Sequence, residues 1–448
     1  MMEKTQVLIL GGGPAGLVAA GTARAYYPDK AITLVRDVER ALVPCGIPYI
    51  FNRLGSVDKN LIPDTGLEAQ NVTLLLDSAT QLDPEAHVVT FASGRKIEYE
   101  KLVLAVGSAP VELPIPGATQ AGVYYVKKDP GYLREMHAAV SEAKRIVIIG
   151  GGFIGVEFAE EIAHLPGKEV SVVEMLPCCL AQAFDEELCV VGEEELKKLG
   201  VKIHTNSKVL QLTGDGQVTG VALADGTELP ADLVIFSIGA RPNIKLAQEA
   251  GLTIGYSGGI WVDEYLRTTA PDIFAVGDCA EKKDFFTRRV TRVMLASTAS
   301  AEARIAGANL YSLRVVRDNR GTLATFSTRL GEMTIAAAGL TESRAREEGF
   351  DVVISHAKTV NRHPGSLPDA KTTQVKLIFS ADSLVLLGGQ VAGGQEAGEL
   401  INLVALALQN RMTATQLETL QVATHPLLTP APTVYPLVTA AMQAIALA

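Results

Sequence analysis

A glycine-spaced turn that occurs twice constrains this chain more than any other feature. The first copy reads Gly11-x-Gly13-x-x-Gly16 and the second reads Gly150-x-Gly152-x-x-Gly155. Each copy follows an apolar run typical of a buried strand, opens a helical pattern, and precedes a second apolar run. Glycines at this spacing allow a tight turn and let a pyrophosphate approach the N–H groups at a helix start. The repeat therefore predicts two dinucleotide-binding units of α/β type.

The two units show the same order of elements. A strand, a helix and a parallel strand are expected at 7–10, 15–26 and 31–35, and again at 145–149, 154–164 and 170–173. A later buried strand in each unit ends next to a glycine, at 101–106 before Gly107 and at 233–238 before Gly239. From about residue 322 the pattern changes. Alternating strands at 334–338, 374–379 and 384–387, followed by a helix at 396–409, predict a separate α+β domain.

Composition excludes several other classes of protein. The 448 residues suggest about three domains, and 48% hydrophobic with 20% charged residues is an ordinary globular composition. A net charge of -10 argues against nucleic acid as a partner. No apolar run approaches the roughly 20 residues that a membrane helix needs, and the chain starts with a strand-like pattern. Five cysteines without C-x-x-C spacing favour a reducing compartment, so we expect a cytoplasmic protein without a metal site.

The residue after the second strand of each unit bears on nucleotide choice. Glu174 stands there in the second unit, and a carboxylate accepts ribose hydroxyls but repels a 2′-phosphate, which favours NADH over NADPH. The first unit has Arg36 followed by Asp37. Because an arginine cannot accept hydroxyl protons, Asp37 or the main chain is expected at the ribose, with Arg36 over the adenine or at a phosphate.

Two further segments make the chain resemble a known family. They are Thr269–Asp278 (TAPDIFAVGD) and Val43–Tyr49 (VPCGIPY). Together with the two units they resemble the FAD-dependent pyridine nucleotide–disulfide oxidoreductases. The most similar branch has a single redox cysteine and includes coenzyme A-disulfide reductases, NADH oxidases, NADH peroxidases and persulfide reductases.

The resemblance implies the fold and the domain boundaries. Two Rossmann-like domains would bind FAD and NAD, and a C-terminal α+β domain would form a homodimer. The implied boundaries are 1–112 for the first FAD segment, 113–237 for the NAD(H)-binding domain, 238–320 for the second FAD segment and 321–448 for dimerisation.

The resemblance also implies which residues bind the cofactors FAD and NADH. Asp278 would bond the flavin ribityl chain, and the helix that starts near Leu295 would face the flavin pyrimidine. The predicted FAD-binding residues are Gly11, Gly13, Ala15, Gly16, Arg36, Asp37, Pro44, Gly107, Gly277, Asp278, Leu295 and Ala296. The predicted NAD-binding residues are Gly150, Gly152, Phe153, Ile154, Gly155, Glu174 and Gly239. Glu157 resembles the acidic residue beside the nicotinamide.

Cys45 stands where this family places its redox sulfur against the flavin. No second cysteine lies four or five residues away, so its oxidised form must be a sulfenic acid or a mixed disulfide with a small thiol. A nearby flavin and a helix N-terminus are expected to lower the pKa of this thiol. The other four cysteines, including the neighbours Cys178 and Cys179, are interpreted as structural.

A proton donor and an acceptor complete the predicted reaction. His425, before Pro426, resembles the histidine that dihydrolipoamide dehydrogenases bring across the dimer interface, and imidazole suits proton transfer near pH 7. The tyrosines that coenzyme A-disulfide reductases carry are absent around His363. The second of their two phosphate-binding arginines, after Arg24, is replaced by Ala25.

Three hypotheses for the function therefore stay open. In the first, NADH reduces FAD on one face, and electrons pass from the other face to oxidised Cys45, which frees a small thiol or hydrosulfide. In the second, the protein is an NADH oxidase or peroxidase that reduces oxygen or peroxide through a Cys45 sulfenic acid. In the third, it is a flavin redox sensor with negligible turnover.

Overall fold

The computed structural model describes residues 2–315 and 319–448. The first glycine turn follows the carboxyl end of β1, an interior strand of a seven-stranded sheet. The strand order is β3-β2-β1-β6-β5-β4, and β17 pairs with β6. These strands are β1 (Glu3–Leu10), β2 (Ile32–Arg36), β3 (Thr73–Leu76), β4 (Ala79–Asp83), β5 (Val88–Phe91), β6 (Lys96–Leu104) and β17 (Ile273–Ala275). Since β17 comes from much later in the chain, two separate segments build this sheet.

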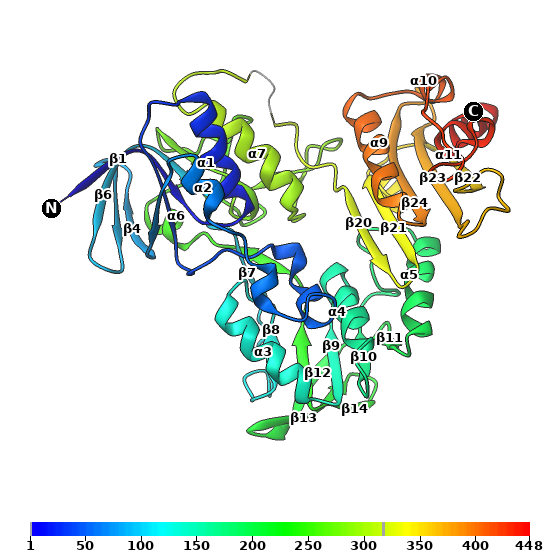
Figure 1. Ribbon diagram of the computed structural model, residues 1–448, viewed down its shortest axis with the longest axis horizontal. Coiled ribbons are helices and arrows are strands. Elements are labelled where there is room, and N and C mark those ends of the chain that lie inside the picture. Colours follow the sequence, from blue (N-terminus) through cyan, green and yellow to red (C-terminus); the bar gives the residue numbers. More distant parts are fainter. Residues whose placement is uncertain (1, 316–318) are drawn as a thin grey trace.

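Helices α1 (Pro14–Tyr26) and α7 (Ala296–Ala308) lie side by side against this sheet (Figure 1). The two helices are in close contact, since a Cβ at Gly307 of α7 would lie only 2.9 Å from the carbonyl oxygen of Ala19 of α1. The packing of α1 against α7 therefore fixes the N-termini of both helices relative to the same sheet.

The second glycine turn belongs to a five-stranded parallel sheet of order β11-β10-β9-β15-β8. Its strands are β8 (Val123–Tyr125), β9 (Arg145–Ile149), β10 (Glu169–Val173), β11 (Lys202–His204) and β15 (Leu233–Phe236). Its helices are α3 (Pro130–Glu142), α4 (Phe153–Ala163) and α5 (Glu186–Lys198). A small antiparallel sheet of β12 (Val209–Asp215), β13 (Gln217–Leu223) and β14 (Glu228–Pro230) packs beside it.

The chain crosses between these two sheets twice. Strand β7 (Ser108–Pro110) leaves the first sheet, β16 (Ala240–Pro242) returns to it, and the two pair antiparallel. Figure 1 shows β7 in the junction between the blue first part and the cyan-green second part. The predicted crossing at 113–117 therefore lies just beyond an ordered two-stranded link.

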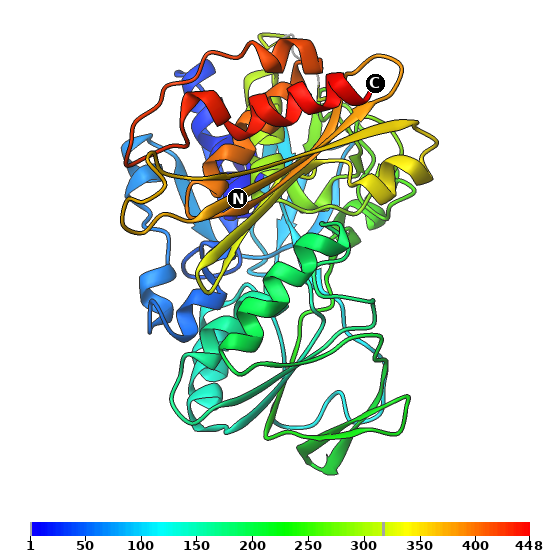
Figure 2. The same ribbon diagram turned by 90° about the vertical axis from the view of Figure 1, so that its right-hand side faces the viewer.

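The C-terminal part is a five-stranded antiparallel sheet covered by helices (Figure 2). Its strands are β20 (Phe326–Leu330), β21 (Met333–Gly339), β22 (Val352–Val360), β23 (Thr372–Ser380) and β24 (Leu386–Gly393). Its helices are α8 (Glu342–Glu347), α9 (Ala397–Gln409), α10 (Ala414–Glu418) and α11 (Pro436–Leu447). The remaining short elements are η1 (Pro44–Gly46), η2 (Pro48–Phe51), η3 (Val57–Asn60), α2 (Thr65–Ala69), α6 (Lys245–Glu249), η4 (Gly277–Cys279), β18 (Lys282–Lys283), β19 (Val290–Thr291) and η5 (Pro432–Val434).

One hydrophobic core joins all three parts. Ile50 and Phe51, which follow Cys45, belong to the same buried cluster as Phe158 of α4 and as Leu330 and Ile335 of the C-terminal sheet. The Phe51 and Phe158 rings lie 5.0 Å apart between centroids. The turn that carries Cys45 is thus fixed against the second sheet's helix by apolar burial.

The α/β fold with a separate C-terminal α+β part is confirmed, whereas the domain boundaries at 112, 237 and 320 stay predictions. The strand expected at 384–387 starts at Leu386 and continues to Gly393. Its glycines are required by close packing, because a Cβ at Gly388 would lie 1.9 Å from the Leu340 carbonyl oxygen. Among the described residues, no helix combines the length and the apolar character needed to cross a membrane.

Candidate active site

Cys45 lies on η1, a tight turn whose backbone is fixed from both sides. The Cys45 residue is exposed, and its thiol is free. Asn60 donates through Nδ2 to the carbonyl oxygen of Val43 over 3.0 Å, and Val43 N–H donates to the Asn60 carbonyl oxygen. A Cβ at Gly46 would lie 2.1 Å from Asn60 Oδ1, so only glycine fits after the cysteine. The sulfur is therefore held in one place by a short rigid loop.

Three charged groups from three elements act on the Cys45 thiol. Although the residue as a whole is exposed, partial burial of the thiol raises its pKa, Glu157 of α4 and Asp278 of η4 raise it further, and Lys128 lowers it. The protein's own groups thus leave this pKa above its ordinary value. The predicted lowering of this pKa by a nearby flavin and a helix N-terminus stays a prediction.

Glu157 is a buried carboxyl group that titrates near neutral pH. It is 9% exposed, and Thr328 of β20 donates through Oγ1 to its Oε1 over 2.8 Å. Burial raises its pKa to about 7, with Glu160 and Glu161 contributing in the same direction. Such a group can hold or release a proton at working pH.

Arg53 ties the loop after Cys45 to α4. Its Nη2 lies 2.8 Å from Glu160 Oε1, it pairs with Glu161, and its backbone N–H donates to Glu161 Oε2 over 3.0 Å. Its guanidinium also lies over the Tyr49 ring, 5.6 Å from the centroid. Both glutamates are fully buried, so the arginine is their main charge compensation. Sequence reasoning missed this clamp because its members lie far apart in the chain.

Asp278 has two partners that the sequence did not indicate. Its Oδ2 accepts from Ser108 Oγ over 2.7 Å and from Lys128 Nζ over 3.1 Å. Burial alone raises the pKa of Asp278, but Lys128 and Ser108 outweigh it, so the pKa lies below its ordinary value. The carboxylate is therefore charged and can accept a ligand hydroxyl.

The first glycine turn fits a dinucleotide. A Cβ at Gly11 would lie 2.1 Å from the Ala105 carbonyl oxygen, and one at Gly16 would lie 1.9 Å from the Gly11 carbonyl oxygen. At Gly13 a Cβ would meet nothing within 4 Å, and no side chain caps α1 there. The turn is thus closed on its inner side and open where the helix N–H groups point. Ala15, within this turn, lies next to Gly277 of η4, since a Cβ at Gly277 would lie 2.9 Å from the Ala15 Cβ.

The second glycine turn repeats this geometry. A Cβ at Gly150 would lie 2.7 Å from the Ser237 carbonyl oxygen, one at Gly155 would lie 1.9 Å from the Gly150 carbonyl oxygen, and Gly152 is open. Glu174 sits beside the turn, where its Oε2 accepts from Gly151 N–H over 2.6 Å. Its carboxylate is fixed at the end of β10, where a ribose is expected.

The other predicted cofactor residues have varied surroundings. Arg36 is buried and pairs with both oxygens of Asp64, at 2.6 and 2.8 Å, while Asp37 is exposed. A contact of Arg36 with FAD therefore stays a prediction.

Phe153 stacks on Phe326 with centroids 5.0 Å apart, and Ile154 follows it on α4. Pro44 starts η1, Leu295 and Ala296 start α7, and Gly107, Gly239 and Gly277 all have positive φ.

His425 and Cys45 lie in different parts of the chain. His425 is exposed in the segment between α10 and η5. Leu427 N–H donates to its Nδ1 over 3.2 Å, so the neutral ring carries its proton on Nε2. None of the interactions among described residues joins His425 to η1. A contribution of His425 to the Cys45 site from the partner subunit stays a prediction.

The remaining candidates are engaged in structural contacts. Arg24 donates to the carbonyl oxygens of Gln70, Pro28, Lys30 and Asn71. The thiols of Cys178, Cys179, Cys189 and Cys279 are free, and burial raises the pKa of each. No group of three or more His, Cys, Asp or Glu side chains among the described residues could hold a metal ion.

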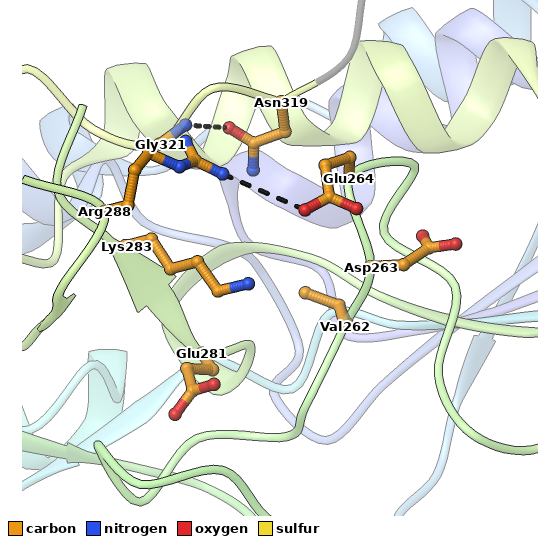
Figure 3. A pocket seen from close by; sticks show the side chains of 8 residues that line it. All are labelled: Val262, Asp263, Glu264, Glu281, Lys283, Arg288, Asn319 and Gly321. Carbon is orange, nitrogen blue, oxygen red and sulfur yellow. Dashed lines mark hydrogen bonds and ion pairs between the residues drawn. The ribbon is translucent and has the colours of Figure 1, made fainter. Parts of the chain in front are cut away.

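A small polar pocket is lined by residues other than these, among them Asp263, Glu264, Lys283 and Arg288 (Figure 3). Arg288 forms an ion pair with Glu264 at 3.9 Å, and Gly321 N–H donates to Asn319 Oδ1 over 2.8 Å. None of the predicted site residues lines it.

Comparison with known proteins defines the class. The family model for pyridine nucleotide-disulphide oxidoreductases matches residues 5–303, and the dimerisation domain of the same family matches residues 326–434. The chain therefore belongs to the pyridine nucleotide-disulphide oxidoreductases. This family is FAD-dependent and uses NADH or NADPH.

Two similar curated proteins carry different names. An NADH oxidase of Methanocaldococcus jannaschii is 30% identical over 426 residues, which are 93% of this chain and 94% of that one. An NAD(P)H coenzyme A polysulfide/persulfide reductase of Pyrococcus horikoshii is 32% identical over 397 residues, 87% of this chain and 88% of that one.

Solved structures show the same division. An NAD-dependent persulfide reductase from A. fulgidus has a TM-score of 0.91 at 30% identity, with 98% of this chain and 83% of that one covered. A water-forming NADH oxidase from Lactobacillus brevis, bound to NADH, has a TM-score of 0.88 at 25% identity, with 99% and 98% covered.

Proposed function

We propose that the protein is an FAD-dependent NADH oxidoreductase that reduces a small disulfide or persulfide through Cys45. The observation that carries this proposal is the setting of Cys45. It is an exposed, free thiol on a rigid turn, with Glu157 and Asp278 near enough to act on its charge. Reductases of persulfide and polysulfide among its relatives support the choice of acceptor.

The two glycine turns assign the cofactors. FAD, when bound, would supply the two-electron relay between NADH and the sulfur. Gly11, Gly13 and Gly16 would hold its pyrophosphate, and Asp278 would accept from its ribityl hydroxyls. Glu174 would bind the ribose of NADH. Asp278→Ala is therefore expected to purify with less FAD, as measured by its visible absorbance, than the yellow wild type with about one FAD per chain.

The sulfur chemistry balances with NADH as the reductant. A mixed disulfide of Cys45 takes two electrons, its S–S bond breaks, and a thiolate remains on Cys45. The departing small thiolate takes one proton, which we assign to His425 of the partner subunit. A persulfide on Cys45 would release hydrosulfide in the same way.

The match to a dimerisation domain supports a homodimer, with one small-molecule acceptor site per subunit. Exposed apolar side chains on α9 and α11, such as Leu406 and Met442, support the same assembly. We infer a cytoplasmic location because an odd number of cysteines, mostly buried, suits a reducing compartment.

A second candidate function is an NADH oxidase or peroxidase. It is favoured by the absence of a resolving cysteine near Cys45, which suits a sulfenic acid, and by relatives named NADH oxidase. A third is a flavin redox sensor with negligible turnover.

Parallel assays separate these functions. NADH consumption is measured with a small disulfide, a sulfane-sulfur donor, oxygen and peroxide, for wild type, Cys45→Ser and the control Cys178→Ser. Sulfur reduction by wild type and Cys178→Ser, with its loss in Cys45→Ser, supports the proposal. Turnover with oxygen or peroxide alone favours the oxidase or peroxidase, and no turnover favours the sensor. A Cys45→Ser enzyme that reduces the sulfur substrate at the wild-type rate excludes the thiol mechanism.

A further inference from the structure

Arg36 stands where a dinucleotide-binding unit normally places the acidic residue that binds a ribose. It is the last residue of β2, at the carboxyl end of that strand. Its side chain runs along the first glycine turn, because a Cβ at Gly12 would lie 2.8 Å from Arg36 Cδ and 3.0 Å from Arg36 Cβ. An arginine donates hydrogen bonds but cannot accept them, so the ribose hydroxyls need another acceptor at this position.

Asp64 is the carboxylate that the fold brings to this arginine. Its Oδ1 accepts from Arg36 Nη1 over 2.6 Å, and its Oδ2 accepts from Arg36 Nη2 over 2.8 Å. Two parallel hydrogen bonds of this kind fix the orientation of both groups. The Arg36 side chain is 3% exposed and that of Asp64 is 23% exposed, so the carboxylate is the member of the pair that reaches the surface.

The Asp64 carboxylate is charged and can accept further hydrogen bonds. The bonds from Arg36 hold its pKa below its ordinary value. Asp64 is the N-cap residue of α2, where an aspartate usually accepts from the first N–H groups of the helix, but its side chain makes no capping hydrogen bond. The hydrogen bonds that it accepts from the described residues both come from Arg36. Because each carboxylate oxygen has two acceptor sites, one on each oxygen stays open.

The guanidinium of Arg36 also keeps an unsatisfied donor. Its Nε is buried and has no hydrogen-bond partner among the described residues, whereas Nη2 donates to the Glu39 carbonyl oxygen as well as to Asp64. A buried donor without a partner costs free energy, so its presence beside Gly12 points to a ligand that carries an acceptor. The pair therefore offers both an acceptor and a donor next to the glycine turn.

Helix α2 holds Asp64 in this place. Arg24 of α1 donates through Nε to the Gln70 carbonyl oxygen over 2.8 Å and through Nη2 to the Asn71 carbonyl oxygen over 2.9 Å. Leu67 of α2 is buried in the core of the first sheet. The segment that carries the carboxylate is thus attached to the same helix that starts at the glycine turn.

We propose that Asp64, oriented by Arg36, accepts the ribose hydroxyls of the adenosine half of FAD, in place of an acidic residue at the end of β2. Arg36 is then a positioning residue, and the exposed Asp37 is not the acceptor. This inference rests on the proposed function only in its assignment of FAD to the first glycine turn. It is independent of the sulfur chemistry at Cys45.

Exchange of the bound cofactor tests this contact without turnover. The FAD-loaded protein is incubated with equal excesses of FAD and of an FAD analogue whose adenosine lacks the 2′-hydroxyl. Once the ratio is constant, free flavin is removed and the two bound flavins are quantified by mass spectrometry. We expect wild type to prefer FAD about tenfold, as for a hydrogen bond to a charged group, and Asp64→Ala to prefer it less than about twofold.

Asp37 provides the matched control, since it is a second aspartate next to Arg36 in the sequence. Asp37→Ala should keep the wild-type preference. Arg36→Met should lose most of it, because Asp64 is no longer oriented. Arg36→Lys should lie between the two, because an ammonium group cannot hold both carboxylate oxygens in a fixed plane.

Three results would overturn the proposal. They are a wild type without preference, an unchanged preference in Asp64→Ala, and an equal or larger loss of preference in Asp37→Ala. If Asp64→Ala does not retain flavin, Asp64→Asn, which keeps the size of the side chain without its charge, is held to the same criteria. Exchange needs no acceptor substrate, so its outcome and the loss of sulfur reduction in Cys45→Ser are decided separately.

Discussion

Glu157 is a carboxyl group whose environment differs strongly from that of an exposed one. It is buried on α4 next to two other glutamates, and its pKa is raised to about 7. The folded protein therefore binds this proton more tightly than the unfolded chain does. The stabilisation is fully present below about pH 4.5, the ordinary value, and is lost as pH rises through about 7.

Glu157→Gln is expected to flatten the pH dependence of stability. Between pH 5 and pH 8 the free energy of unfolding of the wild type should fall by about 2 to 3 kcal/mol more than that of the variant. Denaturant titrations at four pH values measure this difference. Glu142→Gln, at an exposed position on α3, serves as the control and should follow the wild type. Parallel curves for wild type and Glu157→Gln would contradict the assignment.

Glu174 should set the choice between NADH and NADPH. Wild type is expected to have a kcat/KM about 10- to 100-fold larger for NADH, because a carboxylate repels the 2′-phosphate and bonds the ribose. Glu174→Ala should reduce that ratio. It will also affect both nucleotides, since Glu174 accepts from Gly151 N–H, so the ratio is the informative quantity. Equal efficiencies in wild type would show that this carboxylate does not face the ribose.

Candidate site residues that stand next to a sequence motif could be predicted from the sequence. The residues that contact them in the fold could not. Cys45, Glu157 and Asp278 stand next to motifs of fixed spacing, and the structure gives all three polar or charged surroundings. Their predicted roles remain to be tested. Lys128 and Thr328 have no such signal, because their relevance comes from contacts over long sequence separations.

At the scale of elements, sequence periodicity succeeded where strands are buried on both faces. Strand β9 has the expected bounds of 145–149, and helix α9 starts one residue later than expected. Edge elements such as β4, most of whose residues are exposed or half-buried, lack a continuous apolar run and were not predicted. In β24, which is buried throughout, the glycines interrupt the apolar run, so only its first residues fell within the strand expected at 384–387.

The η4 turn is attached to α7 by a buried ion pair. Lys282 lies 2.9 Å from Glu302 Oε2 and also donates to the Gly277 carbonyl oxygen, while Gly277 N–H donates to the same glutamate. Both side chains are nearly inaccessible to water. The pair therefore links the predicted flavin-binding turn to the helix that starts at Ala296.

The free energy of unfolding of Lys282→Met should be about 3 to 5 kcal/mol lower than that of the wild type, because the substitution leaves the Glu302 carboxylate buried without a cation. It should also retain less FAD, since the Gly277 backbone loses its support. Chemical denaturation and the absorbance of bound flavin measure the two effects. Lys283→Met, at the next position, is the control. The double variant Lys282→Met with Glu302→Met should recover part of the stability, and a loss as large as in the single variant would argue against the ion pair.

In the molecule as a whole, polar contacts fix the C-terminal part on the second sheet's helices. Lys376 of β23 is buried between Asp185, Glu187 and Glu342, at 2.9, 2.6 and 2.9 Å. The β20–β21 turn also contacts α4, where Gly331 N–H donates to Glu160 Oε1 over 3.1 Å. The C-terminal part is therefore oriented by the same helix that carries Glu157.

This orientation has a consequence for assembly. Figure 1 shows α9 and α11 in the upper half of the C-terminal part, away from the second sheet, with α9 on the side that faces the first part. Leu406 and Met442 on these helices are both 56% exposed. A second subunit packed there would bring a second copy of the segment that contains His425 into the assembly.

Subunit mixing tests whether that copy completes the site. His425→Ala should slow release of the small thiol by roughly 10² to 10⁴, the usual contribution of a general acid, while leaving reduction of FAD by NADH intact. Cys45→Ser should lose sulfur reduction. When the two inactive homodimers exchange subunits, each heterodimer holds one site with both native residues. Complete exchange of equal amounts makes half of the dimers mixed, so activity should return toward that of about a quarter of all sites. Native mass spectrometry follows the exchange. Exchange without recovery would place His425 in the same subunit as its cysteine or outside the site, because a contribution in trans requires the mixed dimer to work.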